Sequence, residues 1–305
     1  MEYINHTLEF HIDEPTVITF GKFDGLHRGH ELLMEHLHKM AEECGLKTVV
    51  FTFDIPPKKQ VQDDSVKVLT TNEEKRYIFE QHGIDYLIEC PFTKEIMGME
   101  PENFIAWITK ALSVKSMVVG DDFCFGHNRS GNHKVLQAFE EKYHYKTVVF
   151  QKMQEDHRDI SSTFVREEIA AGNIKKANHL LGYPYFIFSK VLHGNQIGRK
   201  MGIPTINMFL PAEKLLPKNG VYVTQTTISG KTYKSVSNIG CKPTISENNP
   251  VGVETYILDF EGELYDKVIQ VSFLDYIREE KKFDSLPELQ NQIEQDIKTA
   301  QDFSF

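Results

Sequence analysis

A strand-like apolar stretch, a glycine-containing loop and the start of a helical pattern follow one another between residues 17 and 40. This combination constrains the first half of the chain most strongly, because a strand that turns into a helix places backbone N–H groups and the positive end of the helix dipole at one corner. Such a corner is suited to bind a phosphate. His27 and His30 lie there. By themselves they are either phosphate ligands or partly exposed polar residues at a helix start.

The alternation of strand and helix patterns continues to about residue 150 and predicts a parallel sheet covered by helices. The strand-like segments are residues 17–20, 48–53, 86–90, 116–120 and 147–150. The helical patterns between them lie near residues 30–43, 72–82, 101–112 and 132–143. Ligands of such sheets bind beyond the carboxyl ends of the strands. Both the loop at 20–30 and the segment after Gly120 follow a predicted strand in this way.

The pattern changes after Gly182. Residues 160–181 predict one or two short helices, with N-cap candidates at 161–163 and a stop at Gly172. Strand-like segments then follow at short spacing, at 185–192, 221–228, 231–239, 253–260 and 267–273, which predicts an antiparallel barrel or sandwich. A helix over 286–300 closes the chain, with capping-box spacing between Ser285 and Glu288. We therefore expect two domains, 1–182 and 183–305.

Composition narrows the class of protein. A length of 305 residues exceeds what one hydrophobic core usually serves. The formal net charge of −10 argues against a nucleic-acid partner. The four cysteines show no metal-binding spacing, and no apolar run approaches the roughly 18 residues of a membrane span. The N-terminus lacks the pattern of a signal peptide, so we expect a cytoplasmic protein without membrane association, monomeric or weakly self-associating.

Three motifs in the first half resemble those of the bacterial bifunctional riboflavin kinase/FAD synthetase family, in the family's order. They are Gly21-x-Phe23-Asp24-Gly25-x-His27-x-Gly29-His30, Gly120-Asp121-Asp122-Phe123-Cys124-Phe125-Gly126 and Ile160-Ser161-Ser162-Thr163-Phe164-Val165-Arg166. The resemblance implies a Rossmann-like nucleotidyltransferase domain over residues 1–182, which transfers the adenylyl group of ATP to FMN and releases pyrophosphate. The nucleotide-binding residues it implies are Gly21, Phe23, Asp24, Gly25, Gly29, Asp122, Ser162 and Thr163, with His27, His30 and Arg166 in catalytic roles.

A second basic glycine motif lies at residues 198–207, in Gly198-Arg199-Lys200-Met201-Gly202-Ile203-Pro204-Thr205-Ile206-Asn207. A flexible basic loop suits nucleotide phosphates, although the glycines alone also fit an ordinary surface hairpin. Thr205 and Asn207 place two oxygen donors on one face of an extended segment, which suits Mg²⁺.

The family's kinase domain carries a similar motif, and matches continue to residue 286. The resemblance implies a β-barrel riboflavin kinase domain over 183–305 in which Glu254 is the general base and Thr205 and Asn207 hold Mg²⁺. It further implies nucleotide or flavin contacts at Gly198, Arg199, Lys200, Gly202, Pro204 and Arg278. The small molecules implied are riboflavin, FMN, FAD, ATP, ADP and pyrophosphate.

Several positions depart from the family pattern. Cys124 stands where the family usually has an arginine, and residues 53–57 lack the family's histidine. Phe164 occupies a position that is often basic, and Tyr256 one that is often histidine. A riboflavin kinase with a degenerate first domain is therefore the main alternative to a bifunctional enzyme. A non-catalytic flavin-binding regulator is a more remote alternative.

Overall fold

The computed structural model describes residues 1–54, 67–193, 202–241 and 251–304, with the side chains of Cys241 and Val251 excepted. The chain forms two compact units. The first comprises Met1–Val66 and Thr70–Ser161, and the second comprises Lys67–Leu69 and Ser162–Phe305. The assignment of activities to residues 1–182 and 183–305 remains a proposal.

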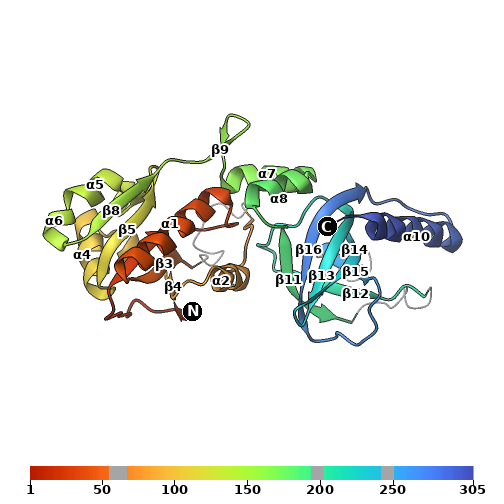
Figure 1. Cartoon of the computed structure of the whole chain (residues 1–305). Helices are drawn as coiled ribbons and strands as arrows, with labels where there is room; N and C mark the ends of the chain where they lie inside the picture. The colour runs from red at the N-terminus through yellow and green to blue at the C-terminus, as the bar shows by residue number, and fades with distance from the viewer. Residues whose placement is uncertain (55–66, 194–201, 242–250, 305) are drawn as a thin grey trace. The chain divides into compact units, whose positions relative to one another are not determined.

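A six-stranded parallel sheet with the order β1-β4-β3-β2-β5-β8 forms the centre of the first unit (Figure 1). Its strands are β1 (Glu2–Asn5), β2 (Thr16–Phe20), β3 (Lys47–Phe53), β4 (Tyr86–Cys90), β5 (Val114–Gly120) and β8 (Lys146–Phe150). The five predicted strands are confirmed, and β1 is an addition. Two short antiparallel pairs follow, β6 (Cys124–Phe125) with β7 (Gly131–Asn132) and β9 (Gln154–Glu155) with β10 (Arg158–Asp159).

Helices cover both faces of this sheet. Helix α1 (Arg28–Cys44) packs on β2, β3 and β5 through a buried stripe and ends at Gly45 in the left-handed conformation (φ 66°). The opposite face carries a core cluster to which α4 (Pro101–Ala111) and α5 (His133–Ala138) contribute. The remaining helices are α2 (Asn72–Gln81), α3 (Lys94–Met97) and α6 (Glu140–Tyr143). The single helix predicted over 132–143 is wrong, because the chain leaves helical geometry at Phe139 (φ −103°, ψ 4°) between α5 and α6.

The second unit is built on a closed six-stranded antiparallel barrel (Figure 1). The strands, in barrel order, are β11 (Phe186–Leu192), β12 (Thr205–Phe209), β15 (Val251–Ile257), β14 (Lys231–Cys241), β13 (Gly220–Ile228) and β16 (Val268–Arg278). This confirms the barrel among the two predicted alternatives. Buried hydroxyl groups bond to one another across its strands, as in Thr224–Ser235 (2.9 Å) and Ser237–Thr255 (2.7 Å). The other face of β13 and β14 packs on helix α10 (Leu286–Asp302).

Helices α7 (Ser162–Ala171) and α8 (Ile174–Leu181) also belong to the second unit. The predicted cap of α10 is half formed: the Ser285 hydroxyl accepts from the Glu288 N–H, whereas the Glu288 carboxylate accepts from the Asp284 N–H rather than from that of Ser285.

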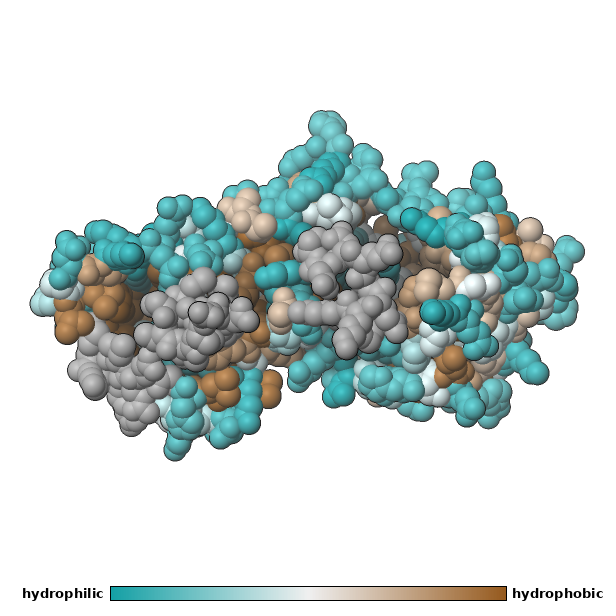
Figure 2. Space-filling model, turned by 180° about the vertical axis from the view of Figure 1, so that it is seen from behind, coloured by the Kyte–Doolittle hydropathy of each residue, from teal (hydrophilic) through white to brown (hydrophobic). Residues whose placement is uncertain are grey.

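Figure 2 shows apolar residues as separate patches among hydrophilic ones on the face in view. Among the described residues, no helix combines the length and apolar character needed to cross a membrane.

Candidate active sites

The loop between β2 and α1 is held in place by Thr70, which lies just before α2. The carboxylate of Asp24 accepts from the Thr70 N–H (3.0 Å), and the Thr70 hydroxyl accepts from the Gly25 N–H (3.1 Å). Gly25 is in the left-handed region (φ 62°), which glycine adopts without strain. Phe23, at φ 46°, is buried against the edge of Phe79. The loop is therefore a rigid turn rather than a loose connection.

His27 and His30 lie at the beginning of α1, and their rings stack with centroids 3.8 Å apart. The His27 carbonyl accepts from the N–H groups of His30 and Glu31 and so starts the helix. In the part of the chain that the structure describes, the buried Nδ1 atoms of both rings lack a hydrogen-bond partner. A side chain at Gly29 would place its Cβ 3.2 Å from Nδ1 of His27, so glycine keeps the approach to this ring open.

Burial keeps both histidines neutral. Loss of solvation lowers the pKa of His27 to about 4, and burial together with the neighbouring His27 ring lowers the pKa of His30 well below its usual range. Asp24 and Asp122 raise the pKa of His27 slightly and Lys152 lowers it, so these charges share its surroundings. Lys152 forms ion pairs with Asp122 (3.0 Å) and Asp159 (3.4 Å).

Lys152 is a site candidate that sequence reasoning missed. The sequence indicates it only through its position: it is a lysine two residues after β8, at the carboxyl edge of the sheet, where ligands of such sheets bind. Cys124, which replaces the family's arginine, is exposed, and its thiol contacts the carbonyl of Asp122 (3.5 Å). Lys152 therefore supplies a positive charge near Asp122, which Cys124 cannot.

The third adenylyltransferase motif lies on α7. Ser162 and Thr163 open the helix, and Arg166 donates from Nε to the carbonyl of Lys67 (3.0 Å). Phe164 is buried, and the ammonium of Lys176 in α8 lies 6.0 Å from the centre of its ring. Because α7 belongs to the second unit, a shared site with His27 and His30 stays a prediction.

A row of polar side chains crosses three strands of the barrel. Asn207 of β12 lies directly opposite Glu254 of β15, and Glu254 lies opposite Asn238 of β14. Directly opposed residues of antiparallel strands project from the same face, with Cβ atoms about 5 Å apart. Thr205 lies on that face as well, opposite Tyr256. The prediction that Thr205 and Asn207 share one face of an extended segment is thus confirmed.

This polar row lies on the outer face of the barrel. Val236, two residues before Asn238, belongs with Ala300 of α10 to one buried cluster, which identifies the face on which α10 packs. Asn207 is buried, whereas Glu254 and Asn238 are half-buried. Gly202 and Pro204 are exposed just before β12. The predicted contacts Gly198, Arg199 and Lys200 lie outside the described residues.

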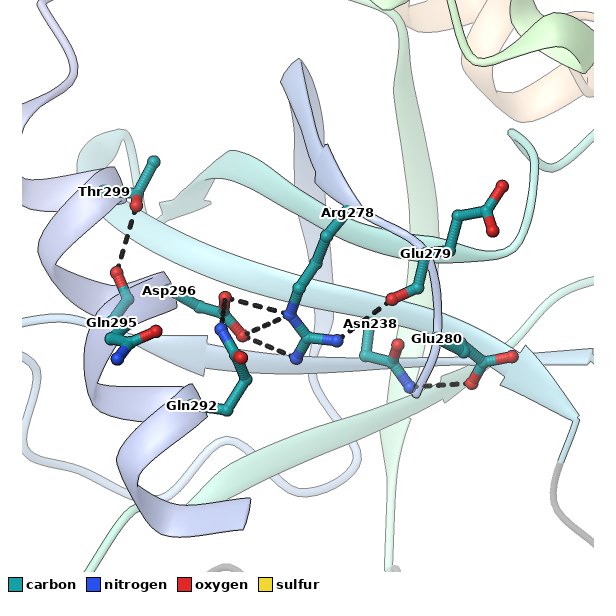
Figure 3. A network of polar contacts seen from close by, with 8 residues as sticks. All are labelled: Asn238, Arg278, Glu279, Glu280, Gln292, Gln295, Asp296 and Thr299. Carbon is teal, nitrogen blue, oxygen red and sulfur yellow. Dashed lines mark hydrogen bonds and ion pairs between the residues drawn. The ribbon is translucent and has the colours of Figure 1, made fainter. Parts of the chain in front are cut away.

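Arg278 has a well-defined partner. Its guanidinium donates from Nε and Nη2 to both carboxylate oxygens of Asp296 (2.7–3.2 Å), and from Nη1 to the carbonyl of Glu279 (Figure 3). Asp296, only 3% exposed, comes from α10. Figure 3 also shows Asn238 and Glu280 beside this pair. Arg278 thus joins β16 to α10 next to the polar row.

The two sites offer different chemistry. The first presents neutral imidazoles at a helix N-terminus, which can bind phosphate oxygens without a proton transfer. The second presents a carboxylate beside amide and hydroxyl oxygens, which suits a general base next to a hard divalent cation. No cluster of three or more His, Cys, Asp or Glu side chains arranged for a metal occurs among the residues described.

Comparison with known proteins gives matches to two family models. Residues 9–164 match the FAD synthetase family, and residues 181–304 match the riboflavin kinase family. A protein of Escherichia coli strain K12 described as bifunctional riboflavin kinase/FMN adenylyltransferase is 36% identical over 301 residues, which covers 98% of this chain and 96% of the relative. A protein of Haemophilus influenzae with the same description is 34% identical, covering 94% and 93%.

A solved structure supports the same relationship at the level of the fold. A crystal structure from Streptococcus pneumoniae, described as a macrolide-efflux protein, is 28% identical with a TM-score of 0.88 and covers 97% of both chains. The two family models match in sequence order, and the bifunctional relatives align over nearly the whole chain. This chain therefore belongs to the bifunctional riboflavin kinase/FMN adenylyltransferase family.

Proposed function

We propose that the chain makes FAD from riboflavin in two ATP-dependent steps. The barrel unit phosphorylates riboflavin to FMN, and the sheet unit transfers an adenylyl group to FMN. The observation that carries the proposal is the row Asn207–Glu254 in register on the barrel, within a chain that matches both family models. The proposed boundary between the functions is 182/183, and the proposed location is the cytoplasm.

The kinase step needs a base because the 5′-hydroxyl of riboflavin has a pKa far above neutral. Glu254 would take the hydroxyl proton while the oxygen attacks the γ-phosphorus of ATP and the bond to the bridging oxygen breaks, releasing ADP. Thr205 and Asn207 fit Mg²⁺ as neutral oxygen donors on the same face, and bound Mg²⁺ would neutralise phosphate charge. The backbone of β12 and β15 fixes these groups relative to Glu254.

The adenylylation step needs no base, since the phosphate of FMN is already ionised at neutral pH. A phosphate oxygen attacks the α-phosphorus of ATP, and the bond between the α-phosphorus and pyrophosphate breaks. His27 and His30 would bind the triphosphate at the N-terminus of α1 as neutral donors. We propose that Ser162, Thr163 and Arg166 complete this site, with Arg166 binding phosphate oxygens through its charged fork.

A riboflavin kinase with an inactive first unit is the second candidate, favoured by the exposed thiol of Cys124 in place of the family's arginine. The two are separated by incubating purified protein with FMN, ATP and Mg²⁺ and measuring FAD and pyrophosphate by chromatography. Formation of both products supports the bifunctional enzyme. Absence of FAD, while riboflavin is still phosphorylated, leaves the kinase alone.

Two variants test the division of labour. Glu254→Gln removes the proposed base and should lower FMN formation at least about 100-fold while adenylylation of added FMN continues. His27→Ala combined with His30→Ala should have the opposite effect. If either variant lost both activities while its circular dichroism spectrum stayed unchanged, the assignment of one activity to each unit would be wrong.

A further inference from the structure

Asn238 continues the polar row beyond Glu254, and the proposed kinase step gives this residue no role. The two residues are directly opposed on β14 and β15, on the face that also carries Asn207. Directly opposed residues have Cβ atoms about 5 Å apart, so a polyol chain with one hydroxyl at Glu254 has a neighbouring hydroxyl within reach of the Asn238 amide. The side chain of Asn238 is half-buried, so part of it is accessible to a ligand.

Glu280 determines which end of the Asn238 amide faces the ligand. The Nδ2 group of Asn238 donates to Oε1 of Glu280 (3.4 Å; Figure 3). An ionised carboxylate accepts hydrogen bonds and does not donate them, so the amide nitrogen must face Glu280. The amide oxygen Oδ1 then points elsewhere, and among the described residues it receives no hydrogen bond. The site therefore presents an acceptor, rather than a donor, beside Glu254.

Gly240 makes room for this arrangement. It lies two residues beyond Asn238 on β14, on the same face of the strand. A Cβ atom at Gly240 would lie 1.9 Å from Oε1 of Glu280 and 2.6 Å from its Cδ, so the Glu280 carboxylate occupies the space that a side chain would fill. The absent side chain lets the carboxylate rest against β14 within reach of Asn238.

We infer that Asn238 binds substrate in the kinase step, its Oδ1 accepting a hydrogen bond from a hydroxyl of the ribityl chain next to the one that Glu254 deprotonates. Glu280 is a positioning residue that holds the amide in the accepting orientation, and Gly240 admits Glu280. The inference rests on the proposed kinase function. It makes Asn238 a determinant of specificity for a polyol chain, because a flavin without hydroxyl groups gains nothing from this acceptor.

The test compares two flavins on the same variants. Riboflavin carries the ribityl hydroxyls, and lumiflavin carries a methyl group in their place. Dissociation constants are measured by quenching of flavin fluorescence with ADP and Mg²⁺ present. Asn238→Ala should weaken riboflavin about 3- to 10-fold, the effect of one neutral hydrogen bond, and should leave lumiflavin within about 2-fold of wild type. Equal weakening of both flavins, or of neither, would overturn the inference.

Three further variants test the positioning role. Glu280→Ala and Gly240→Ala should both weaken riboflavin selectively, since the first removes the carboxylate and the second displaces it. Glu280→Gln should restore most of the binding lost in Glu280→Ala, because its amide oxygen can still accept from Asn238. Glu279→Ala is the matched control, since this neighbouring exposed carboxylate pairs with Lys218 instead. If riboflavin binding stayed unchanged in Glu280→Ala and Gly240→Ala, or if both flavins were weakened equally, the role of Glu280 would be refuted even if Asn238→Ala failed to fold.

The binding measurement separates this inference from the proposed function. If the wild-type protein binds riboflavin but forms no FMN, the kinase proposal is contradicted. The comparison of riboflavin with lumiflavin still tests the Asn238 contact in that case, because it measures binding and not turnover. An active kinase whose riboflavin KM is unchanged in Asn238→Ala would contradict the Asn238 contact alone. The KM for ATP is expected to stay within about 2-fold in every variant of this series.

Discussion

Burial of the stacked histidines makes protonation of their rings unfavourable in the folded chain. The charged form of His27 is disfavoured in the folded chain because this residue is only 7% exposed and its ring loses solvation there. A triphosphate bound between uncharged imidazoles is recognised by hydrogen bonds and by the helix N-terminus, not by paired charges. The same burial links the stability of the first unit to pH.

The pH dependence follows from the pKa of His27, which is about 4 in the folded chain and about 6.5 when unfolded. Between these values the unfolded chain binds a proton that the folded chain does not, so stability falls as the pH is lowered. From pH 7 to pH 5 the loss is about 2 kcal/mol. His27→Gln should remove this loss, so the variant should lose about 2 kcal/mol less than wild type over the same range.

The chain provides its own probe for this measurement. Trp107 is its single tryptophan and packs against Phe10 in the first unit, so urea unfolding followed by tryptophan fluorescence reports on that unit. Each protein is titrated with urea at pH 7, 6 and 5. His11→Gln is the matched control, because its ring is exposed. Parallel pH profiles for wild type and His27→Gln would contradict the link between burial of His27 and stability.

Sequence reasoning succeeded where a residue's role depends on its neighbours along the chain. The glycine loop before His27 and the spacing of Thr205 and Asn207 are local patterns, and the structure places both as the patterns predict. It missed contacts between distant residues. Glu280 against Gly240 joins positions 40 residues apart, and no property of either residue alone indicates the other.

The attachment of helix α10 to the barrel involves a buried polar residue, Asp296, that the apolar pattern of the helix does not reveal. Apolar residues recur along the helix at Leu289, Ile293, Ile297 and Ala300, and α10 packs Ile297 and Ala300 of this stripe into a buried cluster with β13 and β14. Asp296 lies beside this stripe; it is buried and pairs with the half-buried Arg278. Periodicity assigns such an aspartate to solvent, because the pattern carries no information about a cation on a distant strand.

Removing Asp296 should loosen α10. Asp296→Ala leaves the Arg278 guanidinium without its carboxylate, and because that arginine keeps some access to water the expected cost is about 2–4 kcal/mol. Hydrogen exchange of the α10 amides should accelerate, whereas unfolding followed by Trp107 should not change. Glu294→Gln, on the exposed side of the same helix, serves as control. Unchanged exchange in Asp296→Ala would show that α10 is held without the Arg278 pair, by the apolar stripe and by the Lys234 contacts at its C-terminal end.

The strands that sequence reasoning missed were short or polar. β1 (Glu2–Asn5) is a four-residue edge strand with half-exposed side chains, so its place depends on pairing with β4 rather than on its own composition. β12 (Thr205–Phe209) begins inside the glycine motif; the extended geometry of Thr205 and Asn207 was predicted there, but the segment was not assigned as a strand of the barrel. The five central runs of the first sheet were found because buried parallel strands are almost continuously apolar.

For the chain as a whole, the compact units and the family models divide the sequence at different places. Packing groups α7 and α8 with the barrel, although the riboflavin kinase family model begins at residue 181. Lys67–Leu69 belong to the same unit: Val68 bridges to Lys214, and the buried ammonium of Lys214 donates to the Leu69 carbonyl (2.6 Å). The barrel unit is therefore larger than the kinase match, and residues outside that match stabilise it.

The contribution of α7 and α8 can be measured with two fragments, 162–305 and 183–305, which both lack Lys67–Leu69. Asn178 of α8 donates to the Phe273 carbonyl (2.8 Å) and accepts from the Tyr185 N–H (2.7 Å), and α8 buries four apolar residues within the unit. Without α8, the apolar surface of β16 loses its cover. The shorter fragment should therefore unfold about 10 °C or more below the longer one in thermal melts followed by circular dichroism.

Asn178→Ala in the longer fragment should give part of the same decrease in melting temperature. Equal melting temperatures for the two fragments would show that the barrel is stable without these helices and that a structural boundary coincides with the proposed functional boundary at 182.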